Sequence, residues 1–266
     1  MIERKRILIT VKTYPHPDPA DLERVCTAGM LEDGAFIRLY PVPFRYLPKW
    51  QSYAKYQWIQ VDVEKHCGQD RRPESYRPDV DSIRLDGPPI STKHAWAARK
   101  RIVFKQPVRS MEELYDLQEG QNISLGLVRP RVVEDLLIVP DEEDWKPEWK
   151  ADLDQFRLDI GPQRLPLEKI PFKFRYRFRC YDERCNGHTM SLGDWEAGVL
   201  FLKQRRIRGD AQRAASVVRD KFLGELCSSD KDVHFFVGTV AQFGTWIVLG
   251  VFCPPRTSQR PMPLFD

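Results

Sequence analysis

Hydrophobic and polar residues alternate most regularly in two segments of the chain. In QWIQVDVEKH (57–66), Ile59, Val61 and Val63 lie on one side and mostly polar side chains lie on the other. In KIPFKFRYRFRC (169–180), aromatic residues alternate with lysine and arginine. Because successive side chains of a strand point to opposite faces, each pattern predicts a strand with one buried and one solvated face.

Shorter apolar runs predict the remaining strands, since they are rich in β-branched and aromatic residues and end at turn-forming residues. These runs are RILITVK (6–12), AFIRLYPV (35–42), SIRL (82–85), RIVFK (101–105), SLGLV (124–128), VVEDLLIV (132–139), VHFFVGTV (233–240) and TWIVLGVF (245–252).

Four segments carry helix signals such as an N-terminal Ser or Asp cap and a following apolar period. They are LERVCTAG (22–29), SMEELYDLQEG (110–120), SLGDWEAGVLFLKQRR (191–206) and GDAQRAASVVRDKFLGEL (209–226). Short strands that precede a few helices predict an α+β fold, with an OB-like barrel followed by a smaller strand–helix–helix–hairpin part.

The predicted organisation has four parts. They are an OB-like β-rich domain (1–140), an acidic connector (141–168), a basic α+β domain (169–256) and a flexible tail (257–266).

Length, composition and cysteine content indicate where in the cell the protein is located. A chain of 266 residues with 42% hydrophobic residues can bury a sizeable core, and its formal net charge is +4. No window approaches eighteen consecutive apolar residues, so we expect no membrane span. The N-terminus lacks the apolar core of a signal peptide, and the six cysteines form no disulfide framework. These features favour a cytoplasmic location.

The stretch VCTAGMLEDGAFIRLYP (25–41) resembles the start of the dual OB-containing domain family of bacteria. The matching positions are Cys26, Ala28, Gly29, Gly34, Phe36, Ile37 and Arg38. The resemblance implies a nucleic-acid-oriented β-barrel from a prokaryotic defence, mobile-element or DNA-processing system, and it brings no catalytic residues. The alternative is that Cys26 and Ala28 are small core residues of a helix that packs on a sheet.

A row of cations is the strongest indication of a polyanionic partner. Its members share the face opposite the aromatic residues of 169–180, at a spacing of roughly 6.6 Å that resembles the spacing of phosphates. Edge protection of a sheet by positive charge is the alternative. Other arginines lie near aromatic residues or on the predicted helices. The nucleic-acid-binding candidates are Lys173, Arg175, Arg177, Arg179, Arg71, Arg72, Arg77, Arg205 and Arg206.

The segment RCYDERCNGHTMSLGDWEAG (179–198) holds three candidate zinc ligands, Cys180, Cys185 and His188. Zinc in structural sites takes four ligands, so the fourth has to come from elsewhere in the chain. The candidates for that place are Cys67, His66, Cys227 and His234. The alternative is a loop that leads into a capped helix and binds no metal.

The sequence predicts a nucleic-acid-binding accessory protein. One alternative is a metal-dependent nuclease or hydrolase that uses His188, Asp194 and Glu196 as a metal or general-base cluster. Another is a protein-interaction adaptor.

The C-terminal tail ends in the apolar residues Met262, Leu264 and Phe265. It resembles the peptides with which bacterial DNA-processing proteins bind the replication sliding clamp. The alternative is that these side chains pack on the protein's own surface.

Overall fold

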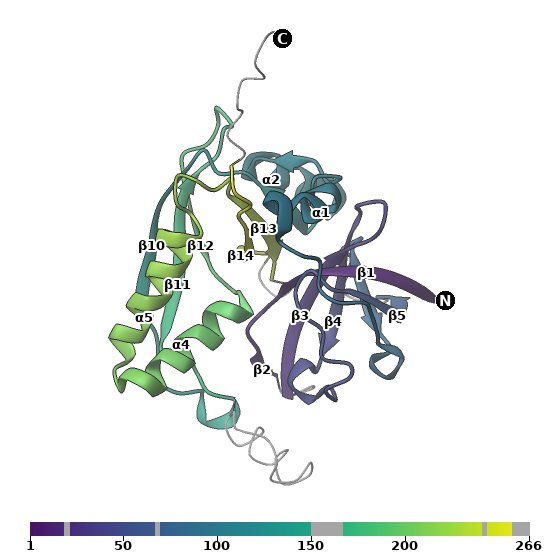
Figure 1. Ribbon diagram of the computed structural model, residues 1–266, viewed down its shortest axis with the longest axis horizontal. Coiled ribbons are helices and arrows are strands. Elements are labelled where there is room, and N and C mark those ends of the chain that lie inside the picture. Colours follow the sequence, from purple (N-terminus) through teal and green to yellow (C-terminus); the bar gives the residue numbers. More distant parts are fainter. Residues whose placement is uncertain (19–21, 67–69, 150–166, 241–243, 257–266) are drawn as a thin grey trace.

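The computed structural model describes residues 1–18, 22–66, 70–149, 167–240 and 244–256 (Figure 1). The strands are β1 (Ile2–Lys12), β2 (His16–Asp18), β3 (Leu22–Met30), β4 (Phe36–Val42), β5 (Trp58–Lys65), β6 (Ser75–Pro78), β7 (Arg84–Asp86), β8 (Val108–Arg109), β9 (Leu125–Val128), β10 (Val132–Pro140), β11 (Phe172–Arg179), β12 (His188–Ser191), β13 (His234–Thr239) and β14 (Trp246–Phe252).

The helices are α1 (Lys93–Val103), α2 (Met111–Gln121), α4 (Trp195–Arg208) and α5 (Ala211–Arg219), and a π-helical turn (Asp220–Glu225) extends α5. Strands and helices both contribute to the core, so the expected α+β class is confirmed. None of the described helices has the length and apolar character that a membrane crossing requires.

Five strands close a barrel in the N-terminal part. The strand order is β1-β3-β4-β6-β5, and the first half of β1 returns to pair with β5 while its second half pairs with β3. The β4–β6 pair is parallel and the other pairs are antiparallel. The interior contains Ile7, Ile37, Ile59 and Val61. This closed barrel confirms the expected barrel and is consistent with an OB-like fold.

The expected helix over residues 22–29 is wrong, because these residues form β3. The strand pairs with β1 on one side and with β4 on the other. Gly29 permits the close approach of β1, since a Cβ at this position would lie 2.4 Å from the carbonyl oxygen of Leu8. The expected strand over 101–105 is also wrong, because these residues form the end of α1 and the turn that follows it. At both places, contacts with distant parts of the chain outweighed the local preference of the residues for a helix or a strand.

The C-terminal part contains two sheets. One has the order β14-β13-β9-β8 and the other β10-β11-β12. A parallel bridge from Leu192 to Val248 connects the two sheets, and β13 pairs antiparallel with β14. The aromatic face of β11 packs with Phe201 of α4 and Val218 of α5 in one core. The predicted strand over 169–180, with aromatic residues buried, is therefore confirmed.

A second apolar core joins the barrel to the C-terminal part. Ala28 and Met30 of β3 belong to the same cluster as Leu127 of β9 and Phe252 of β14. The side of the barrel that carries these β3 residues and Phe36 of β4 therefore packs against the sheet β14-β13-β9-β8. Figure 1 shows β13 and β14 next to the barrel.

Arg38 of the family-like motif crosses this junction and is 1% exposed. Its guanidinium donates hydrogen bonds to the hydroxyl of Ser124 at 2.7 Å and to the carbonyl oxygen of Ser124 at 3.0 Å. Since Ser124 directly precedes β9, Arg38 fixes the barrel to the C-terminal part.

Candidate metal centre

The turn between β11 and β12 gathers three thiol and imidazole side chains. Cys180 follows the last residue of β11, Cys185 lies within the turn, and His188 opens β12 opposite Phe178. Gly187 has a φ of 98°, a left-handed conformation that glycine adopts without a steric penalty. This glycine lets the chain reverse between Cys185 and His188.

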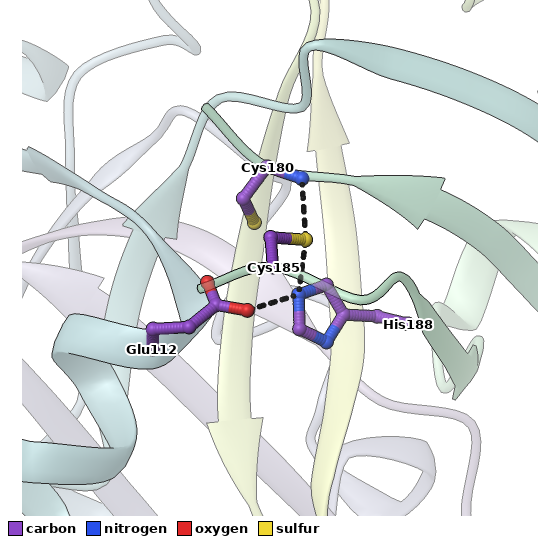
Figure 2. Close-up of side chains that lie close together, drawn as sticks. All are labelled: Glu112, Cys180, Cys185 and His188. Carbon is purple, nitrogen blue, oxygen red and sulfur yellow. Dashed lines mark hydrogen bonds and ion pairs between the residues drawn. The ribbon is translucent and has the colours of Figure 1, made fainter. Parts of the chain in front are cut away.

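Glu112, in the first turn of α2, provides a fourth group from a distant part of the sequence. Its Oε1 lies 3.1 Å from Nε2 of His188, and that nitrogen lies 3.2 Å from Sγ of Cys185. Figure 2 shows the carboxylate, the imidazole and the two thiols pointing toward one another. One ligand atom from each of the four residues lies within 4.8 Å of the other three.

The separations of 3.1 and 3.2 Å at Nε2 of His188 are close to those between neighbouring ligands of a tetrahedral zinc site. With zinc–ligand bonds of about 2.0–2.3 Å, neighbouring ligand atoms lie about 3.3–3.8 Å apart. In addition, Oε2 of Glu112 is buried and has no hydrogen-bond partner. Because a buried carboxylate oxygen without a partner is costly, its presence here is evidence for a ligand that the four residues share.

Each of the two sulfur atoms accepts a hydrogen bond from a backbone amide. The amide of Cys180 donates to Sγ of Cys185 at 3.1 Å, and the amide of Met111 donates to Sγ of Cys180 at 3.4 Å. Such N–H groups favour thiolates, which are the form of cysteine that binds metal.

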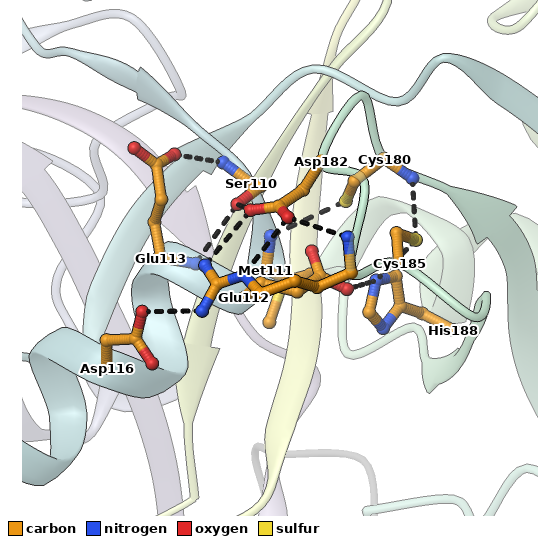
Figure 3. A network of polar contacts seen from close by, with 10 residues as sticks. Ser110, Met111, Glu112, Glu113, Asp116, Cys180, Asp182, Cys185 and His188 are labelled. Atoms are coloured by element: carbon orange, nitrogen blue, oxygen red, sulfur yellow. Dashed lines mark hydrogen bonds and ion pairs between the residues drawn. The ribbon is translucent and has the colours of Figure 1, made fainter.

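A polar network fixes the turn to α2 (Figure 3). Ser110 is the N-cap of α2 in a capping box with Glu113, and its hydroxyl also binds the carboxylate of Asp182 at 2.9 Å. Arg184 binds Asp182 and, through Nη1, Asp116 of α2 at 3.0 Å. The hydrogen bonds from Arg184 hold the pKa of Asp182 well below its usual range. The β11–β12 turn and α2 are therefore held together by contacts that do not involve the four candidate ligands.

Burial changes the pKa values of two candidate ligands, Cys180 and His188. It raises the pKa of the Cys180 thiol to about 12. It also lowers the pKa of His188, and the neighbouring Glu112 opposes that change. A neutral imidazole can ligate a metal, and a cation in the centre would offset the cost of a buried thiolate.

A surface pocket of about 420 Å³ borders His188 and is lined in part by Tyr115, Gln118 and Trp246.

The structure brings together the three predicted ligands, and the fourth group is one that the sequence analysis did not consider. Among the expected sources, His66, Cys227 and His234 are absent from the cluster, and Cys67 lies outside the described residues. Close sequence spacing reveals cysteine and histidine ligands, whereas Glu112 is far from them in the sequence and has the ordinary place of an acidic residue at a helix N-terminus. Its burial against His188 is the signal that identifies it.

The structure separates the three residues of the proposed nuclease cluster. His188 contacts Cys185 and Glu112, whereas Asp194 is the N-cap of α4 and binds Lys55 at 2.6 Å. Glu196 also binds Lys55, at 3.1 Å. Asp194 and Glu196 thus both pair with Lys55. Neither belongs to the cluster of Glu112, Cys180, Cys185 and His188.

The cations of β11 lie on its outer face, as expected, and β11 is the central strand of its sheet. Protection of a sheet edge is therefore not their role. Acidic residues around β10 pair with three of them: Lys173 with Asp141, and both Arg177 and Arg179 with Glu134. Arg175 donates to the carbonyl oxygen of Thr189 at 3.4 Å.

The other predicted cations differ in their surroundings. Arg205 and Arg206 both pair with Glu168, and Arg72 pairs with Asp70 while it donates to the carbonyl oxygen of Thr239. Arg71 and Arg77 are exposed. The structure therefore does not assemble these residues and the β11 row into one array of unpaired charge. The tail residues Met262, Leu264 and Phe265 lie outside the described residues.

Comparison with known proteins places two adjacent domain families along the chain. Residues 3–105 match a domain of unknown function, DUF8758, and residues 107–266 match a domain of unknown function, DUF8757. A search of curated proteins finds no match. Two adjacent domains agree with the dual-domain architecture that the resemblance implied, and neither description assigns an OB fold. Because the second match covers more than half of the sequence, the chain belongs to the DUF8757 family.

Proposed function

We propose that the protein binds one zinc ion through Glu112, Cys180, Cys185 and His188, and that it is a zinc-stabilised nucleic-acid-binding protein. The observation that carries the zinc site is the convergence of one ligand atom from each of the four residues to within 4.8 Å of one another, beside a buried Oε2 of Glu112 that has no hydrogen-bond partner. Two thiolates, an imidazole and a carboxylate are all common ligands of zinc.

The zinc has a structural role in this proposal. Catalytic zinc sites keep one position open for water or substrate, whereas four protein ligands complete a tetrahedral shell. The four ligands come from α2 and from the β11–β12 turn, so the ion joins two elements that are far apart in the sequence. Such a cross-link stabilises the folded state, since the unfolded chain has no preformed site.

Metal analysis of the purified protein tests the zinc site. We expect about one equivalent of zinc in the wild type and loss of zinc in Cys185→Ser and in His188→Ala. Cys26→Ser is the matched control, because Cys26 is a free cysteine outside the cluster. Metal-free wild-type protein that folds stably, or a Cys185→Ser protein that keeps its zinc, would contradict the proposal.

Nucleic-acid binding is supported by the OB-like barrel, since such barrels bind oligonucleotides in many proteins. In OB folds the face of the second and third strands and two loops bind oligonucleotides. The β3–β4 side of this barrel packs against the C-terminal part, so this side is not free for such a contact. Electrophoretic mobility shifts across a salt series test this function, because phosphate contacts make affinity fall steeply with salt. A nuclease assay with added Mg²⁺, Mn²⁺ or Zn²⁺ distinguishes binding from cleavage.

A further inference from the structure

The segment between Asp86 and Glu112 has no acidic residue and six lysines and arginines. We call five of these residues, which lie on α1 or within six residues after it, the α1 basic surface: Lys93, Lys100, Arg101, Lys105 and Arg109. None of the five forms an ion pair with any residue in the described part of the chain, in contrast to most of the β11 row. Lys105 donates to the backbone carbonyl of Glu32, a contact that leaves its charge uncompensated.

One side of α1 is anchored in the protein core, and Lys93, Arg101 and Lys105 are exposed, whereas Lys100 and Arg109 are half-buried. Val103 is buried in the core between the barrel and the C-terminal part, and Trp96 and Ile102 pack against the same core. Arg99 does not belong to the surface, because its guanidinium lies over the ring of Tyr56 at 4.1 Å and donates to the carbonyl oxygen of Ile90. Arg101 and Lys105 are exposed.

An exposed aromatic ring lies among the cations. Phe104 is 40% exposed, although its ring packs against His234 at 5.0 Å and Phe252 at 5.6 Å between centroids. Val108, four residues later in the chain, is 42% exposed. The ring is therefore held in place from one side and accessible from the other, which is the arrangement that lets a nucleobase stack on a protein surface.

We propose that the α1 basic surface binds single-stranded nucleic acid, with the cations on phosphates and Phe104 against a base. This inference rests on the proposed nucleic-acid function and assigns it to α1 instead of β11. Charge complementarity favours a polyanion, and the fixed aromatic ring favours nucleic acid over an acidic protein, because bases offer planar faces for stacking.

Two matched charge-reversal variants locate the surface. Arg101→Glu/Lys105→Glu removes the proposed contacts, and Arg175→Glu/Arg177→Glu makes the same change in charge on β11. Fluorescence anisotropy with labelled single-stranded DNA, single-stranded RNA and duplex DNA, across a salt series, gives affinities and salt slopes. We expect the α1 variant to bind at least tenfold more weakly and to show a shallower slope, by about 0.7 for each phosphate that it no longer neutralises. The β11 variant should bind like the wild type.

Phe104→Ala provides a second test that keeps the charge. Loss of base stacking should lower affinity by about fivefold or more without a change in the salt slope. Circular dichroism melting of each variant checks folding, and Arg101→Glu alone replaces the double variant if that variant does not fold.

The outcomes separate the two proposals. Loss of binding in the β11 variant alone would overturn the α1 surface and leave the nucleic-acid function in place. A wild-type protein that binds none of the probes would overturn both. Equal affinity for duplex DNA, together with no effect of Phe104→Ala, would overturn the single-stranded assignment.

Discussion

Glu112 and Glu113 are adjacent acidic residues with different roles. Glu112 contacts His188 in the candidate metal centre, whereas Glu113 completes the capping box with Ser110. Their directions diverge because successive helical residues are rotated by about 100°. A comparison of the two positions therefore separates ligation from helix capping.

We expect Glu112→Gln to speed zinc release, because an amide is a weaker zinc ligand than a carboxylate. Glu113→Gln should leave zinc release unchanged and cost at most about 1 kcal/mol of stability. Transfer of zinc to a chromophoric chelator measures both rates. Equal rates for the two variants would show that Glu112 is not a ligand.

Lys12 is a buried cation at the end of β1. Its Nζ lies 4.2 Å from the ring centroid of Phe44 and donates to the carbonyl oxygen of Tyr53. Burial, together with the nearby Lys55, lowers the pKa of Lys12 from its ordinary 10.5 to about 8. Between these two pH values the unfolded state binds more protons than the folded state, so this group makes stability rise with pH.

Replacement of Lys12 by Met should therefore stabilise the protein most at pH 8 and below, by up to about 3 kcal/mol. The advantage should shrink as the pH rises toward 10.5, because the wild-type lysine then becomes neutral in both states. Urea unfolding of both proteins across this range measures the difference. A difference that does not vary with pH would refute the lowered pKa.

At the scale of elements, α4 and α5 begin in the same way but differ in what their caps contact. Asp194 caps α4 and is buried against Lys55 of the barrel, whereas Asp210 caps α5 at the surface. The α4 cap thus also connects the barrel to the C-terminal part.

Asp194→Ala should lower the free energy of unfolding by about 3–5 kcal/mol, because it leaves the buried ammonium of Lys55 without its closest partner. Asp210→Ala is the matched control and should cost only about 1 kcal/mol, the usual effect of removing a helix cap. Chemical denaturation of both variants gives these numbers. Similar losses of stability in the two would mean that the Lys55 pair adds nothing to the cap.

At the scale of the whole molecule, the family match and the packing divide the chain differently. The two family matches meet at residue 106, yet one apolar cluster contains residues from both sides of that position. Met30 of the barrel and Phe252 of β14 are fully buried in that cluster. Arg38 and Ser124 add a buried polar contact across the same junction.

A fragment of residues 1–106 should therefore not fold as a stable domain, because its β3–β4 side would expose apolar surface that the full chain buries. We expect it to aggregate, or to melt without cooperativity, in circular dichroism and size-exclusion experiments. A monomeric fragment with a cooperative transition near that of the full chain would show that the barrel is independent.

The sequence by itself determined the features that depend on neighbours along the chain. The alternation in β5 and β11 predicted their buried faces because the period of a strand is local, and the capping residue Ser110 predicted the start of α2 because a cap acts on its own helix. Cys180, Cys185 and His188 could be proposed as ligands because they lie within one turn.

Tertiary structure decided the features that depend on distant partners. β3 is a strand because β1 and β4 pair with it on both sides, and Glu112 joins the metal centre because α2 packs beside the β11–β12 turn. The β11 cations were predicted as a binding row, but Glu134 and Asp141 neutralise much of their charge across β10. A cation's availability depends on the carboxylates that folding brings within ion-pair distance, and the order of residues along the chain does not specify that distance.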